Sequence, residues 1–478
     1  MASSHTISRH RVFDPLALRE VWGQAWPTVL TMLSYTLMQF VDSLMVAQVG
    51  QVELAAQGNG AIWSFVPMVL VFGVLSVVNT FVAQSLGARR PHEVTRYGWA
   101  GIWMALLAWA LLLVPYGLAL PWIFSHMGHD ARLMELETDY CSILVFGGAA
   151  TLLGRGVANF FFGIQKPGIV TVGAVAGNVI NLLLNWVLIY GSLGLPSLGI
   201  PGVPGVPPMG IAGAAIATVI GSMVEAAIPL WVFLGRRMHE RFSVRSDWRL
   251  DARALRDLLR VGSPAALQQG TEILTWAVFS SVLVGRFGAT ALAAGWATLR
   301  YLHLSFMPAV GFGVAATSLV GRHIGAGDPE TAAARARTAL VLAIAYMSLC
   351  GGAMLLLRSH LVALFAHGAN TPPDEAARIV ELGSRMMIAA AFFQAFDAVG
   401  IVLMGALRGA GDTLWPGVAS FVLSWALIVG LGWVLVEQAP GLGPMGPWIA
   451  ASAYIVVFGL ALALRWRSGA WRRLHLLQ

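Results

Sequence analysis

The segment AQSLGARRPHE (Ala83–Glu93) returns in altered form as GRHIGAGDPE (Gly321–Glu330), about 240 residues further along the chain. Each copy directly follows a long apolar stretch and contains the Gly, Pro and charged residues that are typical of a turn. VGQVELAAQG (Val49–Gly58) is repeated at nearly the same interval as VGRFGATALAAG (Val284–Gly295). The chain therefore consists of a duplicated unit, and each half should contain the same series of apolar stretches.

The composition is that of an integral membrane protein. Of the 478 residues, 57% are hydrophobic and only 11% are charged, whereas soluble proteins carry about 25% charged residues. Apolar stretches of about 20 residues are long enough to cross a bilayer as helices. We count twelve such stretches, at residues 22–46, 58–82, 97–120, 137–163, 168–191, 210–235, 258–285, 290–320, 336–357, 380–407, 415–436 and 446–466.

The basic residues orient these spans in the membrane. If both termini lie in the cytoplasm, most of the 30 Lys and Arg residues are on the inner side, as the positive-inside rule predicts. The exceptions are five arginines on the outer side (Arg132, Arg286, Arg358, Arg378, Arg385) and two within spans (Arg155, Arg300). The net charge of +7 therefore indicates topology and not nucleic-acid binding. The polar N-terminal segment predicts no cleaved signal peptide.

The two halves predict two lobes of six helices each. We expect a first lobe at residues 1–235, a cytoplasmic linker at 236–257, and a second lobe with a short cytoplasmic tail at 258–478. Six helices repeated in one orientation are related by a pseudo-two-fold axis along the membrane normal. The predicted fold class is an all-α integral membrane protein with twelve transmembrane helices. Transporters built in this way bind their substrates near the repeat interface and work by alternating access.

Three carboxylates lie inside the apolar stretches: Asp42, Glu272 and Asp397. A charged side chain at the centre of a membrane helix costs roughly 2.5–3.5 kcal/mol on insertion scales, so it usually faces a cavity or a partner. Glu272 and Asp397 lie near the middle of the seventh and tenth spans. They indicate handling of cations or protons, and the alternative is a protonated carboxyl group hydrogen-bonded within a helix bundle.

Asparagines accompany Asp42 at the same predicted height. Asn181 and Asn185 lie at i and i+4 on one helical face, and Asn178 precedes them by three residues. Hard cations prefer oxygen ligands, so Asp42 with the amide oxygens of Asn181 and Asn185 forms a candidate Na⁺ site. Two alternatives stay open, because Asp42 could lie at the outer rim of its span and asparagines also bond membrane helices to one another.

Four further segments follow one another in a specific order across the spans. They are MQFVDSLMVAQVG (Met38–Gly50), GNVINLLLNWVLIYG (Gly177–Gly191), MGIAGAAIAT (Met209–Thr218) and MGALRGAGDT (Met404–Thr413). With the paired turns quoted above, they make the chain resemble the multidrug and toxic compound extrusion (MATE) antiporters, in particular their NorM-type branch. The resemblance implies two six-helix lobes arranged in a V around a central cavity. It also implies export of small cationic, amphipathic drugs in exchange for Na⁺ or H⁺.

The same resemblance suggests roles for individual residues. It places Asp42, Asn181 and Asn185 in a cation site of the first lobe, with Thr218 as a further contributor. It makes Glu272 and Asp397 the two carboxylates of the second lobe, where they could bind Na⁺ or H⁺. One departure is Gly295–Trp296, which stands where a His-Gln pair is expected in the eighth span. The resemblance further implies a monomer in the bacterial inner membrane, in contact with lipids, with no cofactor besides the coupling ion.

Arg300 is a cation within the eighth span, and two arrangements are open to it. It could pair with Glu272 or Asp397, or its side chain could extend toward the outer surface. Glu225 and His303 are further titratable groups inside spans. Aromatic and Met side chains of several spans could line a cavity for flat cations.

Two other functions compete with drug export. GAGD occurs at Gly325–Asp328 and Gly409–Asp412, as in intramembrane GxGD proteases, but both copies fall at predicted cytoplasmic turns. A lipid-linked-precursor flippase of related fold should line its cavity with arginines, whereas the second lobe offers carboxylates. The chain has no nucleotide-binding P-loop. The sequence therefore favours secondary active export over catalysis or ATP-driven transport.

Overall fold

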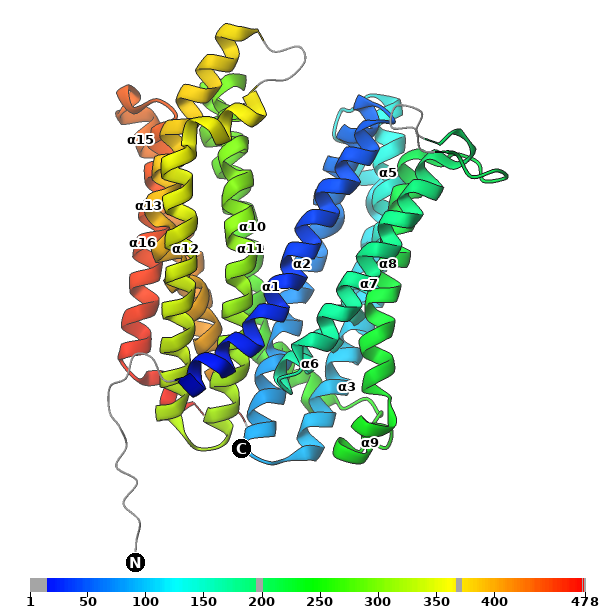
Figure 1. Ribbon diagram of the computed structural model, residues 1–478, viewed down its shortest axis with the longest axis vertical. Helices are drawn as coiled ribbons and strands as arrows, with labels where there is room; N and C mark the ends of the chain where they lie inside the picture. Colours follow the sequence, from blue (N-terminus) through cyan, green and yellow to red (C-terminus); the bar gives the residue numbers. More distant parts are fainter. Residues whose placement is uncertain (1–14, 195–200, 367–371, 475, 477–478) are drawn as a thin grey trace, which may run out of the picture.

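The computed structural model describes residues 15–194, 201–366, 372–474 and 476, and these fold into helices joined by short turns. The helices form two groups that meet at the end carrying α9 and the C-terminus and diverge toward the opposite end (Figure 1). The N-terminal segment for which we expect no signal peptide, and part of the loop between α7 and α8, lie outside the described residues.

In the described ranges, the first group contains eight α-helices. They are α1 (Pro15–Ala47), α2 (Gln51–Gly87), α3 (Pro91–Ala108), α4 (Val114–Ser125), α5 (Ala131–Phe146), α6 (Gly148–Gly163), α7 (Pro167–Asn185) and α8 (Gly210–Phe233). The short helix α9 (Arg236–Phe242) follows in the linker. The second group consists of α10 (Ala252–Val278), α11 (Ala289–Gly325), α12 (Pro329–Ala366), α13 (Pro373–Ala410), α14 (Leu414–Leu423), α15 (Gly432–Gln438) and α16 (Met445–Arg467).

Each of the twelve predicted spans corresponds to helical structure. Ten helices in the described ranges are long and apolar enough to cross a membrane, and the pair α5–α6, bent by 42°, makes an eleventh span. The seventh predicted span is α10 continued by a π-helical segment, η5 (Phe279–Val284). It is less apolar because Gln268, Gln269 and Glu272 lie in its middle. The all-α, multi-span fold class is confirmed.

Three other spans also contain π-helical turns. They are η1 (Trp109–Leu113) between α3 and α4, η2 (Trp186–Tyr190) after α7, and η7 (Ser424–Leu431) between α14 and α15. A π-turn inserts an extra residue into a helix and is frequent at functional sites. η2 and η7 occupy equivalent places in the two halves, since Trp186 and Trp425 align at an interval of about 240 residues.

The hydrophobic cores show that the first helix of each half reaches across to the other half. Val21 and Ala25 of α1 are buried in the core formed mainly by α11, α12, α13 and α16. Ala254 and Leu258 of α10 are buried in the core formed mainly by α2, α3 and α6. The exchange is reciprocal, as a duplicated unit predicts. The lobe boundaries at residues 235 and 258 stay a prediction. The first turns of α1 and α10 each pack into the core of the other half.

The two groups meet along a seam in which α2 and α11 play equivalent parts. A Cβ atom on Gly87 would lie 1.9 Å from the carbonyl oxygen of Arg322, and one on Gly325 would lie 2.0 Å from that of Gln84. These two contacts are the same contact seen twice, related by the pseudo-two-fold axis. Any side chain larger than hydrogen at either glycine would therefore force the helices apart.

Hydroxyl groups complete this seam in the same reciprocal way. Thr80 on α2 donates to the carbonyl oxygen of Arg408 at 2.9 Å, and Ser318 on α11 donates to that of Phe162 at 2.7 Å. Gln84 adds a bond from its Nε2 to the carbonyl oxygen of Gly409 at 2.9 Å. The seam thus closes one end of the V with polar bonds that a modest separation of the lobes would break.

Candidate functional site

The four residues predicted for the first lobe come together from three helices. Asn185 on α7 donates through Nδ2 to Asp42 Oδ1 on α1, and also to Asn181 Oδ1 at 3.2 Å. Asn181 in turn donates to Thr218 Oγ1 on α8 at 3.2 Å. Asp42, Asn181 and Asn185 are all buried. We call this set of Asp42, Asn181, Asn185 and Thr218 the Asp42 layer.

One atom of the Asp42 layer has no partner. The Oδ1 atom of Asn185 is buried and makes no hydrogen bond with any described residue. A buried acceptor without a partner loses its hydration without compensation, so a cation or a water molecule beside it would be stabilised. An amide oxygen next to a carboxylate is an oxygen donor set that suits a hard monovalent cation. The residues present therefore fit the predicted Na⁺ site.

The Asp42 layer also has neighbours that the sequence did not reveal. Tyr140 on α5 is buried, bonds with Gln57 of α2, and lies within electrostatic range of Asp42. Gln57 lies within the repeated segment Val49–Gly58 but is not distinguished in it, and Tyr140 belongs to no motif. Asn178, predicted as a less certain member, lies lower and donates instead to Ser34 Oγ on α1 at 2.5 Å.

The second lobe holds its own polar site around Glu272 on α10. Its Oε1 atom accepts from Gln268 Nε2 at 3.0 Å and from Ser420 Oγ on α14 at 3.4 Å. Ser420 also shares a hydrogen bond of 3.2 Å with the Tyr454 hydroxyl on α16. Asp397 on α13 is half-buried and lies within electrostatic range of Glu272. The two predicted carboxylates of this lobe therefore interact electrostatically.

The cation near this site is not the one the sequence suggested. Arg300 is exposed, and its guanidinium lies 5.7 Å from the ring centroid of Phe365. The structure thus places Arg300 against Phe365, and no salt bridge joins it to Glu272 or Asp397 in the described chain. Arg408, at the end of α13, contacts Gln268 Oε1 at 3.5 Å and lies within electrostatic range of Glu272. Because Arg408 belongs to a turn motif at the span boundary, the sequence indicates it only as one of the inner-side basic residues.

Other residues of the second-lobe site were missed for different reasons. Gln268 stands four residues before Glu272 on one helical face, a spacing that would have indicated it. Ser420 is the repeat equivalent of Asn181, which the alignment of Trp186 with Trp425 makes visible. Nothing in the sequence distinguishes Tyr454 from a core tyrosine.

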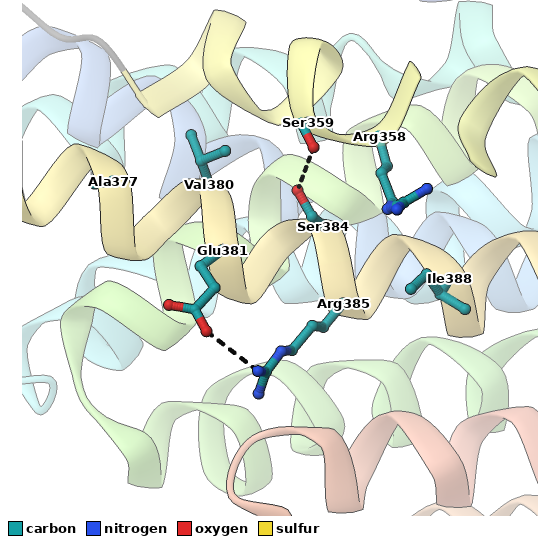
Figure 2. Close-up of a pocket in the computed structure, with 8 residues that line it drawn as sticks. All are labelled: Arg358, Ser359, Ala377, Val380, Glu381, Ser384, Arg385 and Ile388. Carbon is teal, nitrogen blue, oxygen red and sulfur yellow. Dashed lines mark hydrogen bonds and ion pairs between the residues drawn. The ribbon is translucent and has the colours of Figure 1, made fainter. Parts of the chain in front are cut away.

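One pocket of the described chain lies apart from these sites. It has a volume of about 420 Å³ and opens between the C-terminal part of α12 and the N-terminal part of α13 (Figure 2). Its polar groups are bonded within the hairpin, with Arg385 paired to Glu381 at 3.2 Å and Ser384 to Ser359 at 3.4 Å. It contains none of the predicted site residues. The two polar sites within the lobes, and not this pocket, are the candidate functional sites.

Comparison with known proteins shows the family to which the chain belongs. The MatE family model matches residues 27–187 and 264–434. The chain is 32% identical over 468 residues to the multidrug resistance protein NorM of Burkholderia vietnamiensis, covering 98% of this chain and 95% of that protein. It is 30% identical over 461 residues to a probable NorM of Mesorhizobium japonicum, covering 94% and 93%.

Solved structures show the same fold. A crystal structure of MATE in complex with MaL6 superimposes with a TM-score of 0.84 at 20% identity, covering 96% of this chain and 98% of that one. An outward-facing multidrug resistance MATE family transporter gives 0.83 at 20% identity, covering 96% and 97%. The fold is thus that of a two-lobed membrane transporter. The chain belongs to the MatE family and, within it, to the NorM-type proteins.

Proposed function

We propose that this protein is a secondary multidrug antiporter that exports small cationic, amphipathic compounds in exchange for Na⁺ or H⁺. The observation that carries the proposal is the presence of a polar carboxylate site inside each lobe, Asp42 in the first and Glu272 with Asp397 in the second. Intramembrane carboxylates are costly and mark ion or substrate pathways. Relatives that share about a third of their residues with the chain are called multidrug resistance proteins.

In this proposal each lobe contributes a cation site that changes its charge when it is loaded. The Asp42 layer offers a carboxylate and the free amide oxygen of Asn185. In the second lobe, Glu272 and Asp397 bring two acidic groups close together, and a bound cation or proton would relieve their mutual repulsion. A bound cationic drug would relieve the repulsion between these carboxylates as the coupling ion does. Competition between drug and ion for these carboxylates would therefore couple their opposite movements.

The orientation and the setting are part of the proposal. We infer that both termini lie in the cytoplasm of a bacterial inner membrane, since most basic residues would then be on the inner side. The glycine and hydroxyl seam would then close the cytoplasmic side, so the diverging end of the lobes would face outward (Figure 1). A monomer is sufficient, because each chain holds both lobes.

The two competing functions are less well supported. The GAGD segments lie at the turns that end α11 and α13. Asp328 accepts a hydrogen bond from the backbone N–H of Thr331, and Asp412 forms a salt bridge with Arg465. Carboxylates committed to turns in this way are not the convergent pair that an intramembrane protease needs. In a flippase, Glu272 and Asp397 would repel the anionic lipid-linked precursor.

The decisive experiment measures export from proteoliposomes under separately imposed gradients. A fluorescent cationic dye is loaded, and a sodium gradient or a proton gradient is applied alone. We expect one of the two gradients to drive dye movement against its own concentration, with the other gradient having little effect. Dye movement that needs neither gradient would contradict antiport, and transport of anionic lipid precursors alone would favour the flippase.

A further inference from the structure

A second polar layer lies beneath the Asp42 layer on the same three helices. Tyr35 precedes Asp42 by seven residues on α1, Asn178 precedes Asn185 by seven on α7, and Glu225 follows Thr218 by seven on α8. Seven residues are close to two helical turns, so each pair shares one face and is separated by about 10.5 Å along the helix. Three helices that repeat the same spacing place two layers of polar groups one above the other.

The lower layer is connected by hydrogen bonds, as the upper one is. The Tyr35 hydroxyl donates to Glu225 Oε1, which joins α1 to α8. Asn178 Nδ2 donates to Ser34 Oγ at 2.5 Å, which joins α7 to α1. We call Ser34, Tyr35, Asn178 and Glu225 the Glu225 layer. Asn178 and Asn181 lie one turn apart on α7, so this helix offers amide groups continuously from one layer to the other.

Close packing of α7 against α8 fixes the position of Glu225. A Cβ atom on Gly177 would lie 3.0 Å from Glu225 Cβ, and one on Gly173 would lie 2.8 Å from the Glu225 carbonyl oxygen. The helices therefore approach each other directly at this residue, and only glycines allow it. From this position its carboxylate reaches Tyr35 on α1.

The electrostatic surroundings of Glu225 leave its charge only partly balanced. Arg155 on α6 lies within electrostatic range of Glu225 and Tyr35. Its guanidinium stands 4.7 Å from the ring centroid of Phe72, and it forms no salt bridge with any described carboxylate. Glu225 is half-buried, and its one side-chain hydrogen bond in the described chain comes from a neutral phenol. A carboxylate in this setting is stabilised by a monovalent cation that binds to it.

We infer that the Glu225 layer is a second cation station of the first lobe, which a proton or Na⁺ occupies in addition to the Asp42 layer. The inference rests on the proposed antiport function. Glu225 supplies the charge, and the hydroxyl groups of Tyr35 and Ser34 supply neutral oxygens. When the station is filled, the charge of Arg155 is no longer balanced, so the lobe presents a net positive group to an approaching cationic drug. Two cation sites along the same three helices would let a coupling ion move within the lobe while the drug is being released.

The test counts bound cations in a protein whose second-lobe site has been silenced. The parent carries Glu272→Gln and Asp397→Asn, so that only first-lobe sites remain. Binding of ²²Na⁺ is measured at alkaline pH, and proton release is measured with a pH indicator when tetraphenylphosphonium is added. We expect Glu225→Gln to lose one cation relative to this parent, Asp42→Asn to lose another, and the double variant to lose both.

Control variants keep the result interpretable. Glu137→Gln removes another buried carboxylate of the same lobe, one that is bonded to Asn59 at 2.7 Å and His129 at 2.8 Å, and it should keep the cation count of the parent. Tyr35→Phe keeps Glu225 and removes only the hydroxyl. It should weaken ²²Na⁺ binding several-fold if the ion is Na⁺, or shift proton release to higher pH if the ion is H⁺.

The possible failures are distinguishable. A parent that binds no Na⁺ and releases no proton overturns the proposed coupling of the first lobe, and the inference with it. A parent that responds, together with a Glu225→Gln variant that keeps the full cation count, overturns the inference alone. If Glu225→Gln does not fold, an unchanged ion response in Tyr35→Phe overturns it.

Discussion

The two lobes descend from one repeat, yet their polar sites are built differently at equivalent positions. Asn181 and Asn185 of the first lobe correspond to Ser420 and Ser424 of the second, at the same interval of about 240 residues. The long amides reach across to Asp42 and Thr218 and connect three helices. The short hydroxyl of Ser420 reaches Glu272 only at 3.4 Å, and Asp397 makes no hydrogen bond in the described chain.

This difference shows which parts of the repeat tolerate change. The glycine contacts at Gly87 and Gly325 and the π-helical segments η2 and η7 are kept in both halves. The side chains that fill the two sites are not. Backbone features are kept because both lobes need the same packing at the seam. The first lobe has become a well-bonded site with one carboxylate, and the second a loosely bonded site with two carboxylates and Arg408 nearby.

The largest effect should come from removing charge in the second lobe. Glu272→Gln and Asp397→Asn should each insert into the membrane normally and lose export of a cationic dye almost completely, because each removes an acid from a pair that acts together. Dye efflux at matched expression is the measurement. Glu381→Gln, at an exposed carboxylate of α13, is the control and should export normally. Normal efflux by both site variants would remove the second lobe from the coupling mechanism.

A smaller effect is expected in the first lobe, where amides share the ligand role. Asp42→Asn should lower ion-driven exchange about tenfold, equivalent to about 1.4 kcal/mol. Asn185→Ala should lower it only about threefold, since it removes a neutral ligand and no charge. Exchange rates and ²²Na⁺ binding are compared in the same proteoliposomes. If both stay unchanged in Asp42→Asn, the Asp42 layer only holds the helices together.

Arg408 offers a more specific way to sharpen the comparison, because the Asp42 layer has no arginine of its own. A guanidinium close to Glu272 competes with any cation that binds there. Arg408→Gln should therefore tighten cation binding in the second lobe about fivefold, or about 1 kcal/mol. Arg300→Gln is the matched control and should leave binding unchanged, since Arg300 lies against Phe365. The opposite pattern would restore Arg300 as the partner of the carboxylates.

Much of the fold could be predicted from the sequence, because membrane helices carry a strong local signal. Runs of apolar residues indicated every span, including α10, whose middle is interrupted by Gln268, Gln269 and Glu272. The reciprocal crossing of α1 and α10 could not be predicted. It depends on which distant helix buries Val21 or Ala254, and a local pattern contains no information about that choice.

The candidate sites were predictable to the extent that their residues are unusual in apolar surroundings. Asp42, Glu272 and Asp397 were indicated because a charge inside a span needs an explanation. The roles of Tyr140 and Tyr454 were not, since tyrosine is common in such helices. Arg408 was missed because an arginine at the end of a span is normally a topological signal. The seven-residue spacings of the two layers can be read from the sequence. Only the structure shows that the lower residues are bonded to one another across helices, as Tyr35 is to Glu225.

The smallest effect concerns the linker, which is bonded by charge to the first lobe. Asp251 begins α10 by accepting from the N–H groups of Arg253 and Ala254 at 2.8 and 3.1 Å, and Arg96 of α3 bonds its carboxylate at 2.6 Å. This guanidinium lowers the pKa of Asp251 from 3.8 to about 2. A lowered pKa in the folded state stabilises the protein above pH 3.8, and the stabilisation is lost as the pH falls through about 2.

Asp251→Asn isolates this ion pair, because asparagine caps a helix about as well as aspartate does. The variant should be less stable than the parent by about 0.5 kcal/mol near neutral pH, a small value because the pair is partly exposed. The difference in thermal unfolding temperature should be about 1 °C between pH 5 and 7 and should shrink below pH 4. Asp130→Asn is the matched control, since Asp130 caps α5 through Arg132 and Leu133 but receives no guanidinium bond within the described chain. A pH-dependent difference of equal size in both variants would assign the effect to helix capping, and the linker would then not be tied to the first lobe by charge.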